Sequence, residues 1–118
     1  MEKKKLTRLV RDWLNAWNSR DIDRLMDHYH EDIEFTSPTV IKRWNNPSGK
    51  LIGKEALRKH FMKGFEQANH IQFELLGILE GIDGFILVYR KEMQGMGADL
   101  VTLNEMGKAM KVVCYRLD

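Results

Sequence analysis

An apolar stripe at the start of the chain restricts its folding more than any other feature of the sequence. Its members recur at steps of three and four residues, which is the spacing of one face of an α-helix. They are Leu6, Leu9, Val10, Trp13, Leu14 and Trp17. Because such a face must be covered by another element, the segment predicts a helix that packs on a layer built from the rest of the chain.

A second helix and a short strand are expected next. Asp21 can cap the helix, because aspartate side chains accept hydrogen bonds from the first free backbone N–H groups. The residues that repeat the helical spacing are Ile22, Leu25, Met26 and Tyr29. Apolar and polar residues then alternate over 33–37, which is typical of a strand, and Pro38 ends it because proline lacks a backbone donor.

The segment 39–52 predicts a loop, because it contains the turn-forming run Asn45-Asn46-Pro47-Ser48-Gly49. The run is surrounded by basic and aromatic side chains, namely Lys42, Arg43, Trp44 and Lys50. Loops on a rigid scaffold commonly carry specificity, so this loop can close over an acidic ligand. Its charges can equally face water, and both interpretations stay open.

The rest of the chain predicts one more helix and a series of strands. The helix begins near Lys54, and Asn69-His70 stops it; its apolar face carries Leu57, Phe61, Phe65 and Ala68. Four strands are expected at 71–80, 84–93, 99–104 and 109–117, separated by glycine-containing turns that suit antiparallel hairpins. The order predicts an α+β fold in which three N-terminal helices pack on a strongly curved, mostly antiparallel sheet.

Length and charge limit the class of protein. The chain has 118 residues, which fits a single domain over 1–118. Nineteen Lys and Arg against 17 Asp and Glu give a net charge of +2, too balanced for a protein that depends on phosphate attraction. No apolar run approaches the roughly 20 residues of a membrane helix, and the single Cys114 excludes an internal disulfide. We expect a cytoplasmic protein that binds neither nucleic acid nor membrane.

No motif points to a metal or a cofactor. His28 and His30 diverge on a helix, and His60 and His70 have no evident ligand partners. A glycine-rich phosphate loop is absent from the sequence. We therefore expect no metal site and no cofactor.

Two stretches of the chain are similar to a known superfamily. They are 16–25, AWNSRDIDRL, and 29–38, YHEDIEFTSP, and the segment 53–57, GKEAL, fits as well. They resemble the nuclear transport factor 2-like superfamily, and its SnoaL-like branch more closely, over almost the whole chain. The resemblance implies a cystatin-like, cone-shaped α+β barrel with a cavity, and often a dimer. It implies no single reaction, because members of such a superfamily differ widely in chemistry.

Ketosteroid isomerases are related to this branch, and their three catalytic positions can be compared with the residues of this sequence. Those enzymes use a carboxylate base after the first strand, a tyrosine on the first helix and a protonated aspartate on a late strand. Here these positions hold Ser37, Trp13 and Asp99. Serine does not abstract a carbon-bound proton without a neighbouring base, so Asp99 is the expected proton carrier.

The segment 89–92 resembles limonene-epoxide hydrolases, in which an arginine bridges two acids. Here Arg90 and Glu92 fit the arginine and one acid, while the second acid position holds Cys114. Arg90 and Glu92 can form a charge-stabilising pair in the site or an ordinary exposed ion pair, and both interpretations stay open. The run 85–89 is apolar on both faces, so either this pair or Tyr89 and Lys91 points inward.

The sequence thus predicts a pocket that binds a small, largely apolar organic molecule. An enzyme would use cofactor-free acid–base chemistry, as an isomerase, cyclase or hydrolase, with Asp99, Arg90 and Glu92 as catalytic residues. The alternative is a non-catalytic dimerisation or ligand-binding module, with a homodimer formed through the sheet face. The expected pocket-lining residues are Trp13, Trp17, Tyr29, Phe35, Ser37, Trp44, Phe61, Phe65, Val101 and Cys114.

Overall fold

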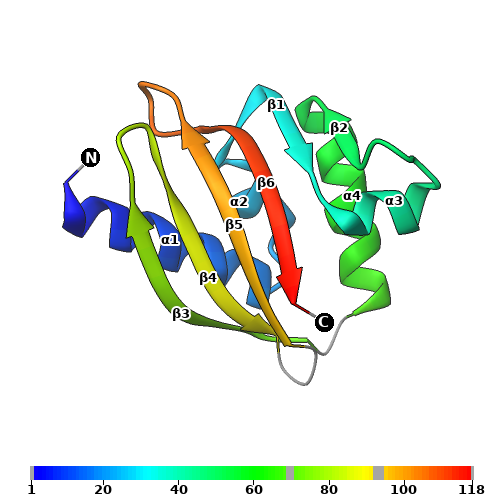
Figure 1. Cartoon of the computed structure of the whole chain (residues 1–118), viewed down its shortest axis with the longest axis horizontal. Helices are drawn as coiled ribbons and strands as arrows, with labels where there is room; N and C mark the ends of the chain where they lie inside the picture. The colour runs from blue at the N-terminus through cyan, green and yellow to red at the C-terminus, as the bar shows by residue number, and fades with distance from the viewer. Residues whose placement is uncertain (1, 69–70, 92–94, 118) are drawn as a thin grey trace.

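Helices cover one face of a curved, open sheet in this α+β structure (Figure 1). The computed structural model describes residues 2–68, 71–91 and 95–117. The helices are α1 (Lys3–Asn18), α2 (Ile22–Met26), α3 (Pro38–Trp44) and α4 (Lys54–Gln67). The strands are β1 (Tyr29–Thr36), β2 (Lys50–Ile52), β3 (Phe73–Glu80), β4 (Gly84–Lys91), β5 (Gly95–Leu103) and β6 (Ala109–Leu117). This confirms the predicted fold class.

The six strands lie in the order β2-β1-β6-β5-β4-β3. All neighbouring pairs are antiparallel except β1 and β6, which run parallel. The first and last strands of the chain are thus neighbours within the sheet. Phe35 of β1 lies opposite Val112 of β6, and Asp99 of β5 lies between Leu87 of β4 and Cys114 of β6. Alternate side chains of these strands therefore share an inner face, which is turned toward α1 and α4.

The predicted loop over 39–52 is wrong, because the segment contains α3 and β2. Ser37 caps α3 by accepting a hydrogen bond from the Thr39 backbone N–H at 3.3 Å, and Pro38 occupies the first helical turn. A proline that ends a strand is also well placed to begin a helix, since its missing N–H needs no partner there. The described residues thus form four helices where three were expected.

Two boundaries also differ from the expectation. Tyr29 is the first residue of β1, so it belongs to the sheet and does not continue α2. Strand β5 begins at Gly95, four residues before the expected start, and includes a segment that was predicted to be a turn. The expected end of the preceding strand at 93 lies outside the described residues.

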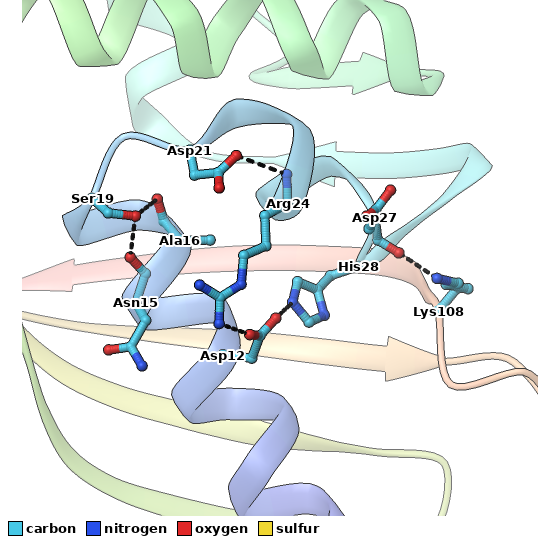
Figure 2. A network of polar contacts seen from close by, with 9 residues as sticks. All are labelled: Asp12, Asn15, Ala16, Ser19, Asp21, Arg24, Asp27, His28 and Lys108. Carbon is cyan, nitrogen blue, oxygen red and sulfur yellow. Dashed lines mark hydrogen bonds and ion pairs between the residues drawn. The ribbon is translucent and has the colours of Figure 1, made fainter.

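A polar network fixes the corner between α1 and α2 (Figure 2). The Asp21 side chain accepts a hydrogen bond from the Arg24 backbone N–H at 3.2 Å, which confirms the predicted cap. On α1, the Asp12 carboxylate accepts hydrogen bonds from the Arg24 guanidinium and, at 2.7 Å, from His28 Nε2. Arg24 is the main cause that lowers the pKa of Asp12. The network ties α2 and the residue before β1 to α1.

Arg20 connects the end of α1 with the start of β3. It has a positive φ of 60°, and its guanidinium donates to the carbonyl oxygens of Trp17 (2.9 Å), Ala68 (2.6 Å) and Ile71 (2.8 Å). These carbonyls lie at segment ends, where helices leave acceptors without an intrahelical partner. The bonds hold the two segments together at one end of the sheet.

The core lies between the inner face of the sheet and the apolar stripes of α1 and α4. Trp17 packs edge-on against Phe61, Phe65 and Phe73, with ring centroids 4.9–5.3 Å apart. The largest side chains that are fully buried are Tyr29, Leu25, Ile33, Leu57, Leu87, Val10, Val40 and Val112. Within the described segments, no helix is long and apolar enough to cross a membrane.

Candidate functional site

A cavity of about 300 Å³ remains between the inner face of the sheet and the helices. This volume is at the lower end of the range for small-molecule sites. The wall is rich in aromatic side chains, because the α1 and α4 stripes meet the inward residues of β1, β3 and β4. Its aromatic members are Trp13, Trp17, Tyr29, Phe35, Phe61, Phe73 and Tyr89.

Asp99 lines this cavity as a buried carboxyl group. Its side chain is held by Tyr89, whose hydroxyl donates to Asp99 Oδ1 at 3.0 Å. Burial raises the pKa of Asp99 to about 6, although hydrogen bonds from the Cys114 thiol and Tyr89 act in the opposite direction. Burial and the nearby Asp99 charge raise the pKa values of Tyr89 and Cys114, so both stay protonated donors at neutral pH.

Gly97 makes room for the ring that holds Asp99. It lies directly opposite Tyr89 in the β4–β5 ladder, and a Cβ atom at this position would come within 2.7 Å of Tyr89 Cζ. That distance is shorter than non-bonded carbon atoms tolerate. Tyr89 can therefore lie flat across β5 and reach Asp99, two residues along the strand, only because position 97 has no side chain.

Three hydrogen-bond donors of cavity-wall residues have no partner among the described residues. They are Trp13 Nε1, the Tyr29 hydroxyl and Arg20 Nε, which are all buried. The Trp13 and Tyr29 rings meet edge-on with centroids 6.2 Å apart. Burial, and then the charge of Asp99, raise the pKa of Tyr29, and the neighbouring Trp13 indole acts in the opposite direction. A buried donor without a partner costs about 1–3 kcal/mol, so a ligand acceptor at this place would gain that energy.

His60 is a cavity residue that the sequence analysis did not select. It lies on α4, and its Nδ1 accepts a hydrogen bond from the Trp44 indole at 3.0 Å, which assigns the ring proton to Nε2. Nε2 is 3.2 Å from Thr39 Oγ1, which in turn is 2.8 Å from Ser37 Oγ. Burial, and then the charges of nearby arginines, lower the pKa of His60 to about 4, so the ring is neutral at pH 7.

The signal for His60 was present in the sequence. It stands three residues after Leu57 and four before Gly64, and all three are buried on one face of α4. The sequence shows no partner with which this histidine could bind a metal, so no expected metal site included it. Within the described part of the chain, no group of three or more metal-ligating side chains is placed to hold an ion.

Most of the predicted pocket residues line the cavity together with Asp99. They are Trp13, Trp17, Tyr29, Phe35, Ser37, Phe61 and Cys114. Three others do not form part of the wall. Phe65 and Val101 are buried in the surrounding core, and Trp44 is 43% exposed and supports His60 from outside.

Arg90 does not face the cavity, so the expectation that it shares the site with Asp99 is wrong. Its side chain is exposed on the outer face of the sheet, where its guanidinium lies 3.8 Å from the Glu74 carboxylate. The alternative orientation of this strand is the one observed, in which the side chains of Leu87, Tyr89 and Lys91 point inward. Glu92 lies outside the described residues, so its predicted catalytic role stays a prediction.

The described wall also contains five basic side chains and, apart from Asp99, no acidic one. Lys42 and Arg43 come from the segment that was expected to be a loop. Lys50 of the same segment instead pairs with Glu34 at 3.0 Å. The other basic wall residues are Arg20, Lys91 and Arg116.

Comparison with known proteins supports the fold that the geometry suggests. No curated protein matches the chain by sequence. A SnoaL-like protein of unknown function from Burkholderia thailandensis has a similar structure, with a TM-score of 0.92 and 23% identity over 100% of this chain and 99% of that one. A provisionally named isomerase of the SnoaL-like family from Agrobacterium tumefaciens has a TM-score of 0.76 and 16% identity over 98% and 99% of the two chains.

A more distant structure has the same architecture. It is a protein with a cystatin-like fold from Methylobium petroleophilum, with a TM-score of 0.79 and 9% identity over 100% of this chain and 79% of that one. The family model for the SnoaL-like domain matches residues 10–112, which is most of the chain. The chain therefore belongs to the SnoaL-like family.

Proposed function

We propose that the cavity binds a small, largely apolar organic molecule and that Asp99 moves a proton on this molecule without a cofactor. The observation that carries the proposal is a buried carboxyl group in the wall of an aromatic cavity. Burying such a group costs free energy that an apolar side chain would not cost. A functional role explains why a carboxyl group stands where the core would favour an apolar residue.

The pKa of Asp99 suits proton transfer in both directions. A group with a pKa of about 6 is mostly ionised at neutral pH, and its conjugate acid returns the proton readily. One such group is sufficient for an allylic isomerisation. Asp99 would remove a proton from the carbon between the carbonyl group and the double bond of a β,γ-enone, and would return it to the γ carbon. The product is the conjugated enone, and neither water nor a second reactant is consumed.

The unpartnered donors support this assignment. As the proton leaves, negative charge develops on the carbonyl oxygen, and hydrogen-bond donors aimed at that oxygen stabilise the transition state. The Tyr29 hydroxyl and Trp13 Nε1 are available for this purpose in the same wall. In the ketosteroid isomerase pattern, the late-strand aspartate donates to the oxygen. Here Asp99 takes the role of the base, because the usual base position holds Ser37.

An epoxide hydrolase mechanism has less support. It needs one carboxyl group to protonate the epoxide oxygen and a second one to activate water. In the described wall, Asp99 is the only carboxyl group, Cys114 stands at the second acid position, and Arg90 lies on the other face of the sheet. Isomerisation is therefore the reaction class that these side chains favour. The provisional name of the relative from Agrobacterium tumefaciens agrees with it.

The test is an assay of small β,γ-enones, because the conjugated product absorbs in the ultraviolet. We expect Asp99→Asn to lower turnover about 10²- to 10⁴-fold, the contribution typical of a positioned acid or base. Asp83→Asn, which removes an exposed carboxyl group at the β3–β4 turn, is the matched control and should keep full activity. Unchanged turnover in Asp99→Asn would exclude this proton carrier. Native mass spectrometry of Asp99→Asn and Asp83→Asn, each purified without added ligand, should show a bound small molecule in both variants.

A binding or dimerisation module is the second candidate, and the outer face of the sheet favours it. This face exposes Leu100 (43%), Tyr115 (61%) and Leu117 (67%) on β5 and β6. Contiguous exposed apolar side chains on a soluble protein commonly mark an interface. A homodimer through this face is compatible with the enzymatic proposal, because the cavity opens on the opposite side of the sheet.

A further inference from the structure

We propose that the ligand of this cavity is an amphipathic organic anion, with an apolar body inside the aromatic wall and an oxyanion group among the basic side chains at the mouth. The inference rests on the proposed function, since it names the class of molecule that the same cavity takes. Carboxylate, sulfonate and phosphate groups share the chemistry that this mouth would recognise.

The basic side chains come from segments that are distant in the sequence and meet at one end of the sheet. Arg20 follows α1, Lys42 and Arg43 belong to α3, Lys91 ends β4, and Arg116 is near the end of β6. The ends of β4 and β6, which carry Lys91 and Arg116, lie at the same end of the sheet, with the start of β5 between them (Figure 1). Five formal positive charges thus line a cavity whose described wall holds one carboxyl group.

Neutral partners hold two of these cations, and no carboxylate among the described residues pairs with either of them. The Arg20 guanidinium donates only to backbone carbonyl oxygens, as described above. Arg43 donates to Gln67 Oε1 at 3.0 Å and to the His60 carbonyl oxygen at 3.2 Å. These bonds fix the position of each guanidinium, and an anion that arrived would meet charges already in place.

Several cations on other surfaces have acidic neighbours. Examples are the pairs Arg58–Asp23, Arg90–Glu74, Lys50–Glu34 and Lys111–Glu34. Among the described residues, none of the five cavity cations forms such a pair. Burial, and then the charge of Arg116, lower the pKa of Arg43, so two like charges lie near each other in the cavity wall. An anion bound between them would turn this repulsion into attraction.

A pair of fluorescent dyes tests the inference. 1-Anilinonaphthalene-8-sulfonate and N-phenyl-1-naphthylamine share one ring system, and only the first carries a negative charge. We expect the sulfonate to bind at least about tenfold more tightly at low salt, equivalent to about 1.4 kcal/mol. The advantage should shrink as salt is added, because salt screens exposed charges. Binding in the cavity is located by the NMR signal of the Trp13 indole N–H, which each bound dye should shift.

Charge-removing variants test which residues recognise the anion. Lys42→Gln, Lys91→Gln and Arg116→Gln should each weaken sulfonate binding about three- to tenfold and leave binding of the neutral dye unchanged. Arg90→Gln is the matched control for Lys91→Gln, because the adjacent residue points to the outer face. Lys111→Gln serves in the same way for Arg116→Gln on β6, since Lys111 lies beside Glu34. Both controls should bind the sulfonate like the parent protein.

The outcomes separate this inference from the proposed function. If both dyes shift the Trp13 signal and bind equally tightly, or if the controls weaken sulfonate binding as much as the mouth variants, the anionic ligand class is overturned and the cavity proposal stands. If neither dye shifts that signal, both proposals are overturned. Tighter binding of the sulfonate, lost only in the mouth variants, would support both.

Discussion

Asp99 is an ionisable residue whose buried surroundings favour its neutral form. The direction in which its contribution to folding stability changes with pH is therefore known. Its pKa is about 6 in the folded protein and about 4 in an unfolded chain. Between these values the folded state binds more protons, so the contribution of Asp99 to stability is full below pH 4 and is lost as the pH rises to 6. An ionised Asp99 therefore destabilises the fold at pH 8.

Replacing Asp99 should reveal this cost. We expect Asp99→Asn to be more stable than the parent by about 1–3 kcal/mol at pH 8, and nearly equal to it at pH 4. Urea unfolding at the two pH values measures both differences. His60 has a pKa lowered to about 4, and its contribution runs in the opposite direction, being lost as the pH falls from about 6.5. His60 is present in both proteins, so its contribution cancels when their stabilities are compared. A stability difference between Asp99→Asn and the parent that did not change with pH would contradict the raised pKa of Asp99.

At the scale of elements, the pairing of β4 with β5 positions the reactive group. Tyr89 reaches Asp99 only across Gly97, so the register of two strands determines the geometry of the site. In Gly97→Ala the new methyl group would displace the Tyr89 ring from the strand. We expect a loss of stability of about 1–3 kcal/mol, as for other overpacked sites, and a pKa of Asp99 that differs from that of the parent protein.

A second glycine of the same sheet provides the control. Gly77 on β3 has no atom within 4 Å of the position of an added Cβ, so Gly77→Ala should fold without strain. Chemical denaturation measures the stabilities, and NMR titration of the Asp99 carboxyl carbon measures its pKa. Equal behaviour of the two alanine variants would show that Tyr89 does not depend on the space at position 97.

At the scale of the whole molecule, the two faces of the sheet have different environments. The inner face bounds the cavity, and the outer face leaves Leu100, Tyr115 and Leu117 exposed. We predict that the protein is a homodimer through the outer face, where a stable interface would bury about 800 Å² on each subunit. Leu100→Arg should produce a monomer in sedimentation velocity, because it places a charge at the centre of that interface.

Exposed apolar residues elsewhere allow a control for this prediction. Ile82 is fully exposed in the β3–β4 turn, away from the proposed interface, and Ile82→Arg should leave the dimer intact. Dye binding in the cavity should survive in both variants, since the interface lies on the other face of the sheet. A parent protein that sediments as a monomer at micromolar concentration would refute the prediction.

Local spacing was sufficient for much of this fold. The stripe from Leu6 to Trp17, the Asp21 cap and the turns of the β3–β4 and β5–β6 hairpins each depend on neighbouring residues, and the structure confirms the elements they predicted. The prediction of a loop over 39–52 was wrong because turn-forming residues dominate this segment. The short helix α3 within it is capped by Ser37, which lies before the segment. The same spacing placed aromatic residues and Asp99 on faces that the structure turns toward one cavity.

The sequence by itself determined the α+β class, the family resemblance and the residues able to build an aromatic pocket, because these follow from periodicity and local motifs. Only the tertiary structure decided that Tyr89 and Lys91, and not Arg90, point inward, since a strand that is apolar on both faces carries no signal of its orientation. It also decided that Arg43 and Arg116 meet near His60, and that Arg20 lines the same cavity. Their approach depends on the curvature of the sheet and the register of its strands, which are long-range properties that no local pattern records.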